Sequence, residues 1–460
     1  MNHHEYEYNS VPISFSHLTV SAYIGRPLRN IGIRRSCLEV PRPRPRSLLP
    51  NPAIIIGGGP AGLATALRLH KHNNITCVVY ELREQPSTLG GAVGIMPNGL
   101  RLFDRLGVCD ELYARGYSGG MLTVHSAAGG VVGAQDMVGW ARSQTGYGYL
   151  RIKRVDLVDV LLDAVRREGI EVKFGVKVTG IEDGVVHTEN GNDRADLVLG
   201  CDGIHSFVRR NVVDPECVSE YSGFAGSFSI VAASQLPSRT VDTMNGLHAM
   251  TTEEGMFMVN PCTANKDEVM WGFSREVELP GHGRDGWEET RKAEVKGFKD
   301  YLLGVLQTAT GEWGSLIKDL IQNTSVVKFH PVYRLPLGGC WYKDRCLLLG
   351  DAAHAMSPHA GQGVSMALED VFLLSRLLED STRPLSQVFA KYDEVRRPRV
   401  NEIYLQAADN ASMRKKTGPW GLWLRETAFG TYMRFSNALG LEKWAFGQKQ
   451  LVYDIDQVEL

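Results

Sequence analysis

The sequence predicts an α/β protein in which a nucleotide-binding domain is interrupted by an antiparallel β-rich domain and followed by a helical region. Three observations predict this class. A short apolar run over residues 53–56 leads into a glycine-rich turn and then a helical pattern. Residues 221–330 alternate apolar and polar side chains, which is typical of an antiparallel sheet with one covered face. A buried-type strand over 345–349 and a long helix over 362–378 then restore the α/β pattern.

The first elements form one βαβ unit. After the strand over residues 53–56, a helical pattern runs from Pro60 to about Lys71, and residues 76–80 predict a second strand that ends at Glu81. Strand, tight turn, helix and strand in this order are the βαβ unit of a parallel sheet. The patterns also predict an amphipathic helix over residues 151–168, strands over 171–174, 185–188 and 197–199, and helices near 288–307 and 315–321.

These patterns divide the chain into five segments. The alternating Pro-Arg run at residues 41–46 can form neither a helix nor a central strand. We favour a disordered extension there, because Glu5, Glu7 and Glu39 weaken the alternative, an Arg-rich transit peptide. The predicted segments are an N-terminal extension (1–50), the first part of the nucleotide-binding domain (51–220), a β-rich substrate domain (221–330), the second part of the nucleotide-binding domain (331–400) and a C-terminal helical region (401–460).

Composition excludes several classes of protein. The 460 residues are 43% hydrophobic and 22% charged, with a formal net charge of -2, which is typical of a folded protein and unlike a basic nucleic-acid binder. No apolar run approaches the roughly 18 residues of a membrane span. The eight cysteines form no CxxC pair. We therefore predict reduced thiols, no metal site and an intracellular, cytoplasmic location.

A glycine motif marks the nucleotide site. Gly57-x-Gly59-x-x-Gly62 follows a strand and opens a helix. The first glycine permits the tight turn, the second lets a pyrophosphate approach the backbone, and the third permits close packing of helix and strand. Glu81 ends the next strand, 19 residues after Gly62, where an acid accepts hydrogen bonds from ribose hydroxyls. The spacing favours this Rossmann-like role over an ordinary surface glutamate.

Two further segments complete a resemblance to a known family. One is Asp202-Gly203 with the residues after it, and the other is Gly350-Asp351-Ala352-Ala353-His354 with Pro358 and Gly361-Gln362-Gly363. Together with the glycine turn, they resemble the FAD-dependent aromatic hydroxylases (group A flavoprotein monooxygenases), in their salicylate-hydroxylase-like branch. The resemblance covers residues 53 to about 400. It implies a para-hydroxybenzoate-hydroxylase-like fold with FAD as the cofactor.

The resemblance also implies which residues hold FAD. Asp351 would hydrogen-bond the ribityl chain, and the glycines at 361 and 363 would leave the backbone bare beside a flat ring. Arg154 precedes Leu157 and Leu161 as in the family's Arg-x-x-Leu-x-x-x-Leu element, whose arginine reaches the cofactor. The predicted cofactor-binding residues are Gly57, Gly59, Pro60, Ala61, Gly62, Glu81, Arg154, Asp202, Gly203, Asp351, Pro358, Gly361, Gln362 and Gly363.

The implied activity is that of an NAD(P)H-dependent FAD monooxygenase. In the family, reduced FAD and O2 give a C4a-hydroperoxyflavin, which hydroxylates or epoxidises an electron-rich aromatic, indole or polyketide small molecule, here expected in secondary metabolism. No second GxGxxG motif is present, which fits NAD(P)H as a transient co-substrate. Two alternatives stay open: a non-oxygenating reductase or oxidase of the same fold, and a catalytically impaired flavin-binding protein.

The substrate site carries the weakest pattern. Phe228 occupies the place where many salicylate-hydroxylase-like relatives carry an arginine, which leaves the catalytic residues unassigned and disfavours a benzoate-type anion. A lone His248 more often has a structural role than that of a base. The residues that we predict to line an aromatic pocket, although each equally suits a strand core, are Phe228, Met256, Met258, Trp271 and Phe273.

Overall fold

The computed structural model describes residues 51–86, 90–236, 241–278, 297–441 and 447–460. The predicted N-terminal extension lies outside these residues, as does the first part of the helix expected near residues 288–307. Residues 297–305 are helical, in agreement with the second part of that prediction.

A six-stranded sheet forms the centre of the nucleotide-binding half, in the order β18-β19-β12-β1-β2-β8. The predicted βαβ unit is confirmed: β1 (Ala53–Ile56) and β2 (Cys77–Glu81) pair in parallel and are joined by α1 (Pro60–Asn73). On its other side β1 pairs in parallel with β12 (Leu197–Gly200). The remaining strands are β8 (Glu171–Phe174), β19 (Cys346–Leu348) and the short antiparallel edge strand β18 (Tyr342–Lys343).

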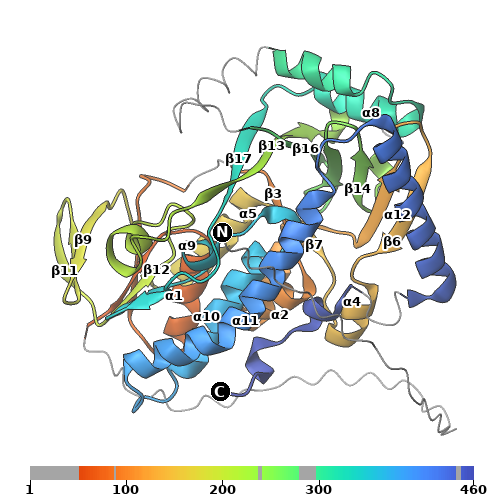
Figure 1. The fold of residues 1–460 in the computed structure, drawn as a ribbon. Coiled ribbons are helices and arrows are strands. Elements are labelled where there is room, and N and C mark those ends of the chain that lie inside the picture. Colours follow the sequence, from red (N-terminus) through yellow and green to blue (C-terminus); the bar gives the residue numbers. More distant parts are fainter. Residues whose placement is uncertain (1–50, 87–89, 237–240, 279–296, 442–446) are drawn as a thin grey trace, which may run out of the picture. The chain divides into compact units, whose positions relative to one another are not determined.

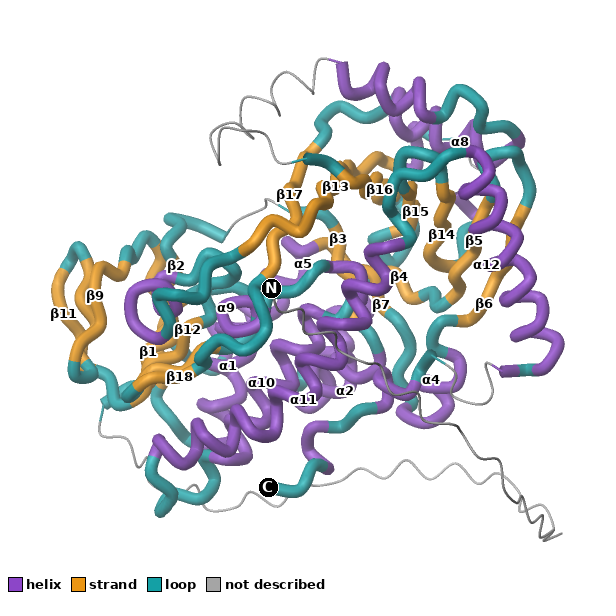
Figure 2. The backbone as a smooth tube through the Cα atoms, viewed as in Figure 1, coloured by secondary structure: helices purple, strands orange, loops and turns teal. Residues whose placement is uncertain are grey.

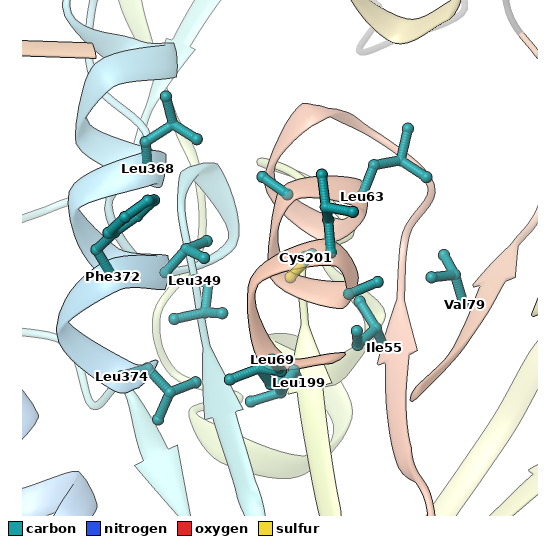
Figure 3. Packing of buried hydrophobic residues seen from close by; sticks show 14 of the residues in the cluster. Ile55, Leu63, Leu69, Val79, Leu199, Cys201, Leu349, Leu368, Phe372 and Leu374 are labelled. Carbon is teal, nitrogen blue, oxygen red and sulfur yellow. The ribbon is translucent and has the colours of Figure 1, made fainter. Parts of the chain in front are cut away.

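Two helices cover this sheet with a continuous apolar core. Figure 3 shows Phe372 of α10 (Gly363–Leu377) beside Leu349, which follows β19, and Leu63 of α1 belongs to the same core cluster as Ile55 of β1. All four side chains are fully buried. Burial of a side chain of this size contributes about 1.5–3 kcal/mol, so this contact fixes the helices on the sheet.

The predicted helix over residues 151–168 begins later than expected. Residues Leu150–Lys153 form β7, which pairs with β3 (Ala92–Ile95), and α5 starts at Arg154 and ends at Arg167. Leu150 and Ile152 are buried while the residues after each of them are not, which is the period of two of a strand. A short strand, β4 (Tyr117–Ser118), completes this three-stranded sheet.

The β-rich domain is a seven-stranded sheet in the order β17-β13-β16-β15-β14-β5-β6. Strands β5 (Met121–His125) and β6 (Val131–Asp136) come from the segment that the sequence assigned to the nucleotide-binding domain, and β5 pairs in parallel with β14. The sequence did not predict this pairing. The other strands are β13 (Glu220–Ala232), β14 (Gly246–Thr251), β15 (Met256–Pro261), β16 (Glu268–Glu276) and β17 (Lys328–Arg334).

One face of this sheet is covered by α8 (Gly311–Gln322), which Figure 1 shows lying across it. Phe257, Trp271 and Phe273 point to this face, where they pack with Leu316 and Ile317 of α8. Because side chains alternate along a strand, the neighbouring positions on β13, β15 and β16 point to the opposite face. We call this opposite face, with Phe228, Ile230, Met256, Met258, Asn260, Met270 and Gly272, the inner face.

The predicted C-terminal helical region is helical, but its first helix crosses the predicted boundary at residue 400. Helix α11 runs from Leu385 to Ser412, and α12 (Pro419–Leu439) lies along the edge strand β6 (Figure 2). No described helix has the length and apolar character needed to cross a membrane. The other elements are α2 (Pro97–Leu106), α3 (Cys109–Arg115), α4 (Gly139–Thr145), β9 (Val178–Glu182), β10 (Val185–Thr188), β11 (Gly191–Arg194) and α9 (Asp351–His354).

A buried ion network joins α9, α10 and α11. Arg396 Nη1 lies 2.8 Å from Glu369 Oε2, and its Nε donates to Asp370 Oδ1 at 2.8 Å. The other oxygen of Asp370 accepts the Gly350 N–H at 2.8 Å and lies 2.7 Å from His354 Nε2. Burial alone would raise the pKa of Asp370, but His354 and Arg396 together hold it below its ordinary value. The network thus keeps Asp370 ionised inside the protein.

We predict that Arg396→Met destabilises the protein by about 3–5 kcal/mol, because it removes the buried cation that Glu369 and Asp370 share. Denaturant unfolding followed by circular dichroism measures this change. Lys177→Met is the matched control, since Lys177 pairs with Glu189 at the surface and should change stability by less than about 1 kcal/mol. An equal decrease in the free energy of unfolding for the two variants would contradict the prediction.

Candidate functional site

The three glycines of the turn have different environments. Gly57 has a φ of 110°, and a Cβ there would lie 2.4 Å from the Cys201 carbonyl oxygen. A Cβ on Gly62 would lie 2.0 Å from the Gly57 oxygen. A Cβ on Gly59 would meet none of the described atoms within 4 Å. Packing therefore requires the first and third glycines, while the second exposes bare backbone where a phosphate can approach the N-terminus of α1.

Glu81 lies against this turn, where the sequence placed it. Its Oε2 accepts the Gly58 N–H at 2.8 Å, and its Oε1 accepts the Arg83 N–H at 2.9 Å. The carboxylate is thus oriented by two main-chain donors at the end of β2. This position suits a carboxylate that accepts hydrogen bonds from the ribose hydroxyls of a nucleotide whose pyrophosphate lies at the turn.

Asp202 and Gly203 follow β12 and adjoin the glycine turn, since a Cβ on Gly57 would lie 2.9 Å from Asp202 Cα. Asp202 Oδ2 accepts the Phe207 N–H at 2.6 Å and the Val208 N–H at 3.2 Å. Its Oδ1 is buried and has no hydrogen-bond partner in the described part of the chain. Burial raises the pKa of Asp202. A hydroxyl or N–H donor of a bound cofactor would satisfy this oxygen.

The second fingerprint reaches the same place from β19. Gly350 has a φ of 60°, and a Cβ there would lie 3.4 Å from Ala61 Cβ, so Asp351 starts α9 beside the glycine turn. Asp351 itself is exposed. Gly57, Asp202 and Asp351 thus follow three neighbouring parallel strands at their carboxyl ends, the edge where open α/β sheets bind ligands.

The loop after α9 leaves space for a flat ring. Pro358 begins a single turn that ends at Gly361, where φ is 64°. Gly363 opens α10, and among the described residues no atom lies within 4 Å of a Cβ placed on it. The first turn of α10 contains no acidic residue. The positive end of the helix dipole can therefore act on an electron-rich ligand edge placed there.

Gln362 in this loop is tied to the buried ion network. It is 4% exposed, and its Oε1 accepts a hydrogen bond from Asn98 Nδ2 at 3.0 Å. The same Asn98 nitrogen donates to Glu369 Oε1 at 2.8 Å. The sequence did not identify Asn98, because a single asparagine in the first turn of α2 belongs to no motif.

Arg154 lies at the start of α5, next to the loop before β3. Its N–H donates to the Gly91 oxygen at 2.9 Å, and a Cβ on Gly90 would lie 2.9 Å from its Cδ. The side chain is exposed and forms no ion pair among the described residues. Burial, and then the charge of Arg154, lower the pKa of His330. The structure thus brings Arg154 to Gly90 and His330, and its contact with the cofactor remains a prediction.

The comparisons with known proteins decide the family. The model of the FAD binding domain family matches residues 51–304 and 333–407. The chain belongs to this family. Over 80% of its length it is 27% identical to 6-hydroxynicotinate 3-monooxygenase of Pseudomonas fluorescens, covering 94% of that protein. Over 77% it is 29% identical to 3-amino-4-hydroxybenzoate 2-monooxygenase of Streptomyces cremeus, covering 85% of that protein.

The solved structures agree on the fold. Klebsiella pneumoniae HpxO, solved with FAD and uric acid, superposes with a TM-score of 0.72 at 21% identity, covering 87% of this chain and 96% of that one. The predicted fold class, the membership in the FAD-dependent aromatic hydroxylases and FAD as the cofactor are confirmed. The protein is therefore an oxidoreductase of the FAD monooxygenase type, with NAD(P)H as the reductant typical of its family.

The residues predicted to line the substrate pocket do not share one face. Trp271 and Phe273 belong to the core under α8. Phe228, Met256 and Met258 lie on the inner face. Side chains alternate between the two faces of a strand, and this alternation separates the two sets of residues. In the sequence, both sets were simply apolar residues of predicted strands.

The inner face also meets the nucleotide-binding half. A Cβ on Gly91 would lie 3.0 Å from the Phe228 ring and 2.8 Å from Met270 Cε, and the Ala92 N–H lies 3.1 Å from Met270 Sδ. Met270 was not among the predicted residues. The loop before β3 therefore packs directly on the face that carries Phe228.

His248 lies on the face that α8 covers. Its Nδ1 is 3.0 Å from His125 Nε2, and both rings stack on Trp313. Burial lowers the pKa of each imidazole to about 4. A buried, neutral histidine pair on the side away from the inner face has a structural role, which agrees with the interpretation favoured from the sequence.

We predict that Gly59→Ala loses bound FAD without loss of stability, because the methyl group enters open space that the pyrophosphate needs. Gly62→Ala should lose both bound FAD and stability, because overpacking at this position lowers the free energy of unfolding by about 1–3 kcal/mol or more. The flavin absorbance per protein and the unfolding temperature of FAD-free protein measure the two effects. Gly304→Ala, also in open space, is the control that retains FAD. A Gly59→Ala protein with full FAD content would refute this assignment.

We predict an acid-sensitive stability from the histidine pair. Well above pH 6.5 both rings are neutral in the folded state and mostly neutral in the unfolded state. As the pH falls from 6.5 towards 4, the two histidines become protonated in the unfolded state but stay neutral in the folded state, because their pKa values there are lower. The free energy of unfolding therefore decreases. The double variant His125→Gln, His248→Gln should show a smaller decrease in unfolding temperature between pH 7 and 4.5. His187→Gln, at the surface, should keep the wild-type slope, and an unchanged slope in the double variant would contradict the prediction.

Proposed function

We propose that this protein oxygenates an electron-rich aromatic small molecule that binds against the inner face of the seven-stranded sheet. The observation that carries this proposal is the contact of Phe228 and Met270 with the loop at Gly91, in the half of the chain that holds the FAD motifs. An aromatic ring and thioethers provide an apolar, polarisable surface for a flat substrate.

When bound, FAD supplies the redox chemistry: it accepts a hydride from NAD(P)H and activates O2. The protein's residues bind and orient it. The turn at Gly59 and the N-terminus of α1 receive the pyrophosphate. The N-terminus of α10 at Gly363 favours negative charge on the ring system. The inner face excludes water from the place where oxygen is transferred and holds the substrate ring in position.

The relatives support a hydroxylated aromatic ring as the substrate class. The names of two of them contain 6-hydroxynicotinate and 3-amino-4-hydroxybenzoate, which are rings activated by hydroxyl or amino substituents. Such substituents raise the electron density of the ring carbon that receives the oxygen. We propose a ring of this kind, modified in secondary metabolism. An intracellular location is supported by the seven described cysteines, which are all free thiols.

We predict that purified FAD-loaded protein oxidises NADH or NADPH faster when a suitable hydroxylated aromatic compound is added. A panel of such compounds, screened by nicotinamide absorbance and then by mass spectrometry with isotopically labelled O2, measures both steps. One labelled oxygen atom in the product is expected. Rapid NAD(P)H oxidation with hydrogen peroxide and no labelled product would favour an oxidase or reductase. A flavin that NAD(P)H cannot reduce would favour an impaired flavin-binding protein.

A further inference from the structure

Arg414, two residues after the end of α11, is a buried cation that has no acidic partner among the described residues. Its side chain is 9% exposed. Nη1 donates to the Asn410 carbonyl oxygen at 2.6 Å, and Nη2 lies 3.9 Å from the thioether sulfur of Met258. Nε is buried and has no hydrogen-bond partner within the described residues. Burial lowers the pKa of Arg414 to about 10, so the guanidinium is still charged at neutral pH.

The other buried arginines have carboxylate partners or several main-chain hydrogen bonds. Arg396 pairs with two carboxylates, and Arg399 lies 3.5 Å from Glu369. Arg209 donates to three main-chain carbonyl oxygens. Arg414 therefore stands apart among the four arginines of the described chain that are buried. A buried charge of this kind is costly unless something pairs with it.

Arg414 lies where the FAD loop meets the inner face. Asn410, whose carbonyl it contacts, donates from Nδ2 to the His359 oxygen at 3.1 Å, within the turn between Pro358 and Gly361. Burial, and then the charge of Arg414, lower the pKa of His359 to about 3. On its other side the guanidinium touches Met258 of the inner face. The unpaired charge thus lies between the two surfaces that enclose the proposed substrate.

A second polar group on the same face has no partner. Asn260 is 2% exposed, and both atoms of its amide group are buried without a hydrogen bond to any described residue. It follows Met258 by two residues on β15, about 7 Å along the strand, and lies opposite Met270 on β16. Buried amides are normally hydrogen-bonded, so an amide whose polar atoms have no partner among the described residues suits a polar ligand.

We propose that Arg414 binds a carboxylate on the aromatic ring of the substrate, and that Asn260 hydrogen-bonds a second substituent of that ring. This inference rests on the proposed function and narrows its substrate class to aromatic anions. The absence of an arginine at Phe228 had disfavoured an anion, but Arg414 supplies the positive charge from the C-terminal region instead. A guanidinium suits this role because its fork matches two carboxylate oxygens.

The test compares matched acids and amides. FAD-loaded protein is titrated with 4-hydroxybenzoate, 4-hydroxybenzamide, 6-hydroxynicotinate and its amide, and binding is followed by the flavin spectrum and by calorimetry. Wild-type protein should bind each acid more tightly than its amide. Arg414→Met should weaken binding of the acids by about ten- to hundredfold and leave the amides unchanged, while Arg414→Lys should restore part of the preference.

Stability separates a ligand-binding role from a structural one. Arg414→Met removes an unpaired buried charge and should keep or raise the unfolding temperature, whereas Arg396→Met should lower it. The acids should raise the unfolding temperature of the wild type but not that of Arg414→Met. Wild-type protein that does not prefer the acids, or an Arg414→Met protein that binds them equally well, would overturn the inference. Binding is measured without turnover, so failure of oxygenation alone would count against the proposed function only.

Discussion

The carboxylate of Asp370 is the constraint on which the flavin half of the structure depends. Inside the protein, it receives the main-chain N–H of Gly350, the imidazole of His354 and the guanidinium of Arg396. These donors come from the two ends of α9, just after β19, and from α11, so one side chain of α10 holds two segments that are distant in the sequence. Because an unpaired buried charge is so costly, the segments can hardly move apart without losing the native state. The position of Asp351 beside the glycine turn follows from this arrangement.

The network extends from structure to function through Asn98. This residue joins Glu369 to Gln362, which precedes the bare backbone at Gly363. The loop that faces the expected flavin ring is therefore oriented from the protein interior. A site held in this way needs little reorganisation when the cofactor binds, which is a condition for electrostatic stabilisation of a reacting ring. The loop is thus joined to the buried ion network through the two hydrogen bonds of Asn98.

The sequence predicted the parts of this protein that depend on neighbours along the chain. The glycine turn, the strands β1, β2 and β12 and the helices α1 and α10 follow from local periodicity and from the motif. It could not predict that β5 pairs with β14, because their contact joins segments more than one hundred residues apart. It also could not tell which strand residues share a face, so Trp271 and Met258 looked equivalent. Asn98 carries no local pattern at all.

Arg414 shows why a motif comparison can misjudge a binding site. In the sequence it opens the basic run Arg414-Lys415-Lys416, which is typical of an exposed segment, and two of these three residues are indeed exposed. Folding places the first of them between the loop at His359 and the strand residue Met258. A positive charge that pairs with an anionic substrate can come from any element that reaches the binding site. Because Phe228 occupies the usual place of an arginine, a positive charge cannot come from that strand position. Another element of the fold can still supply it.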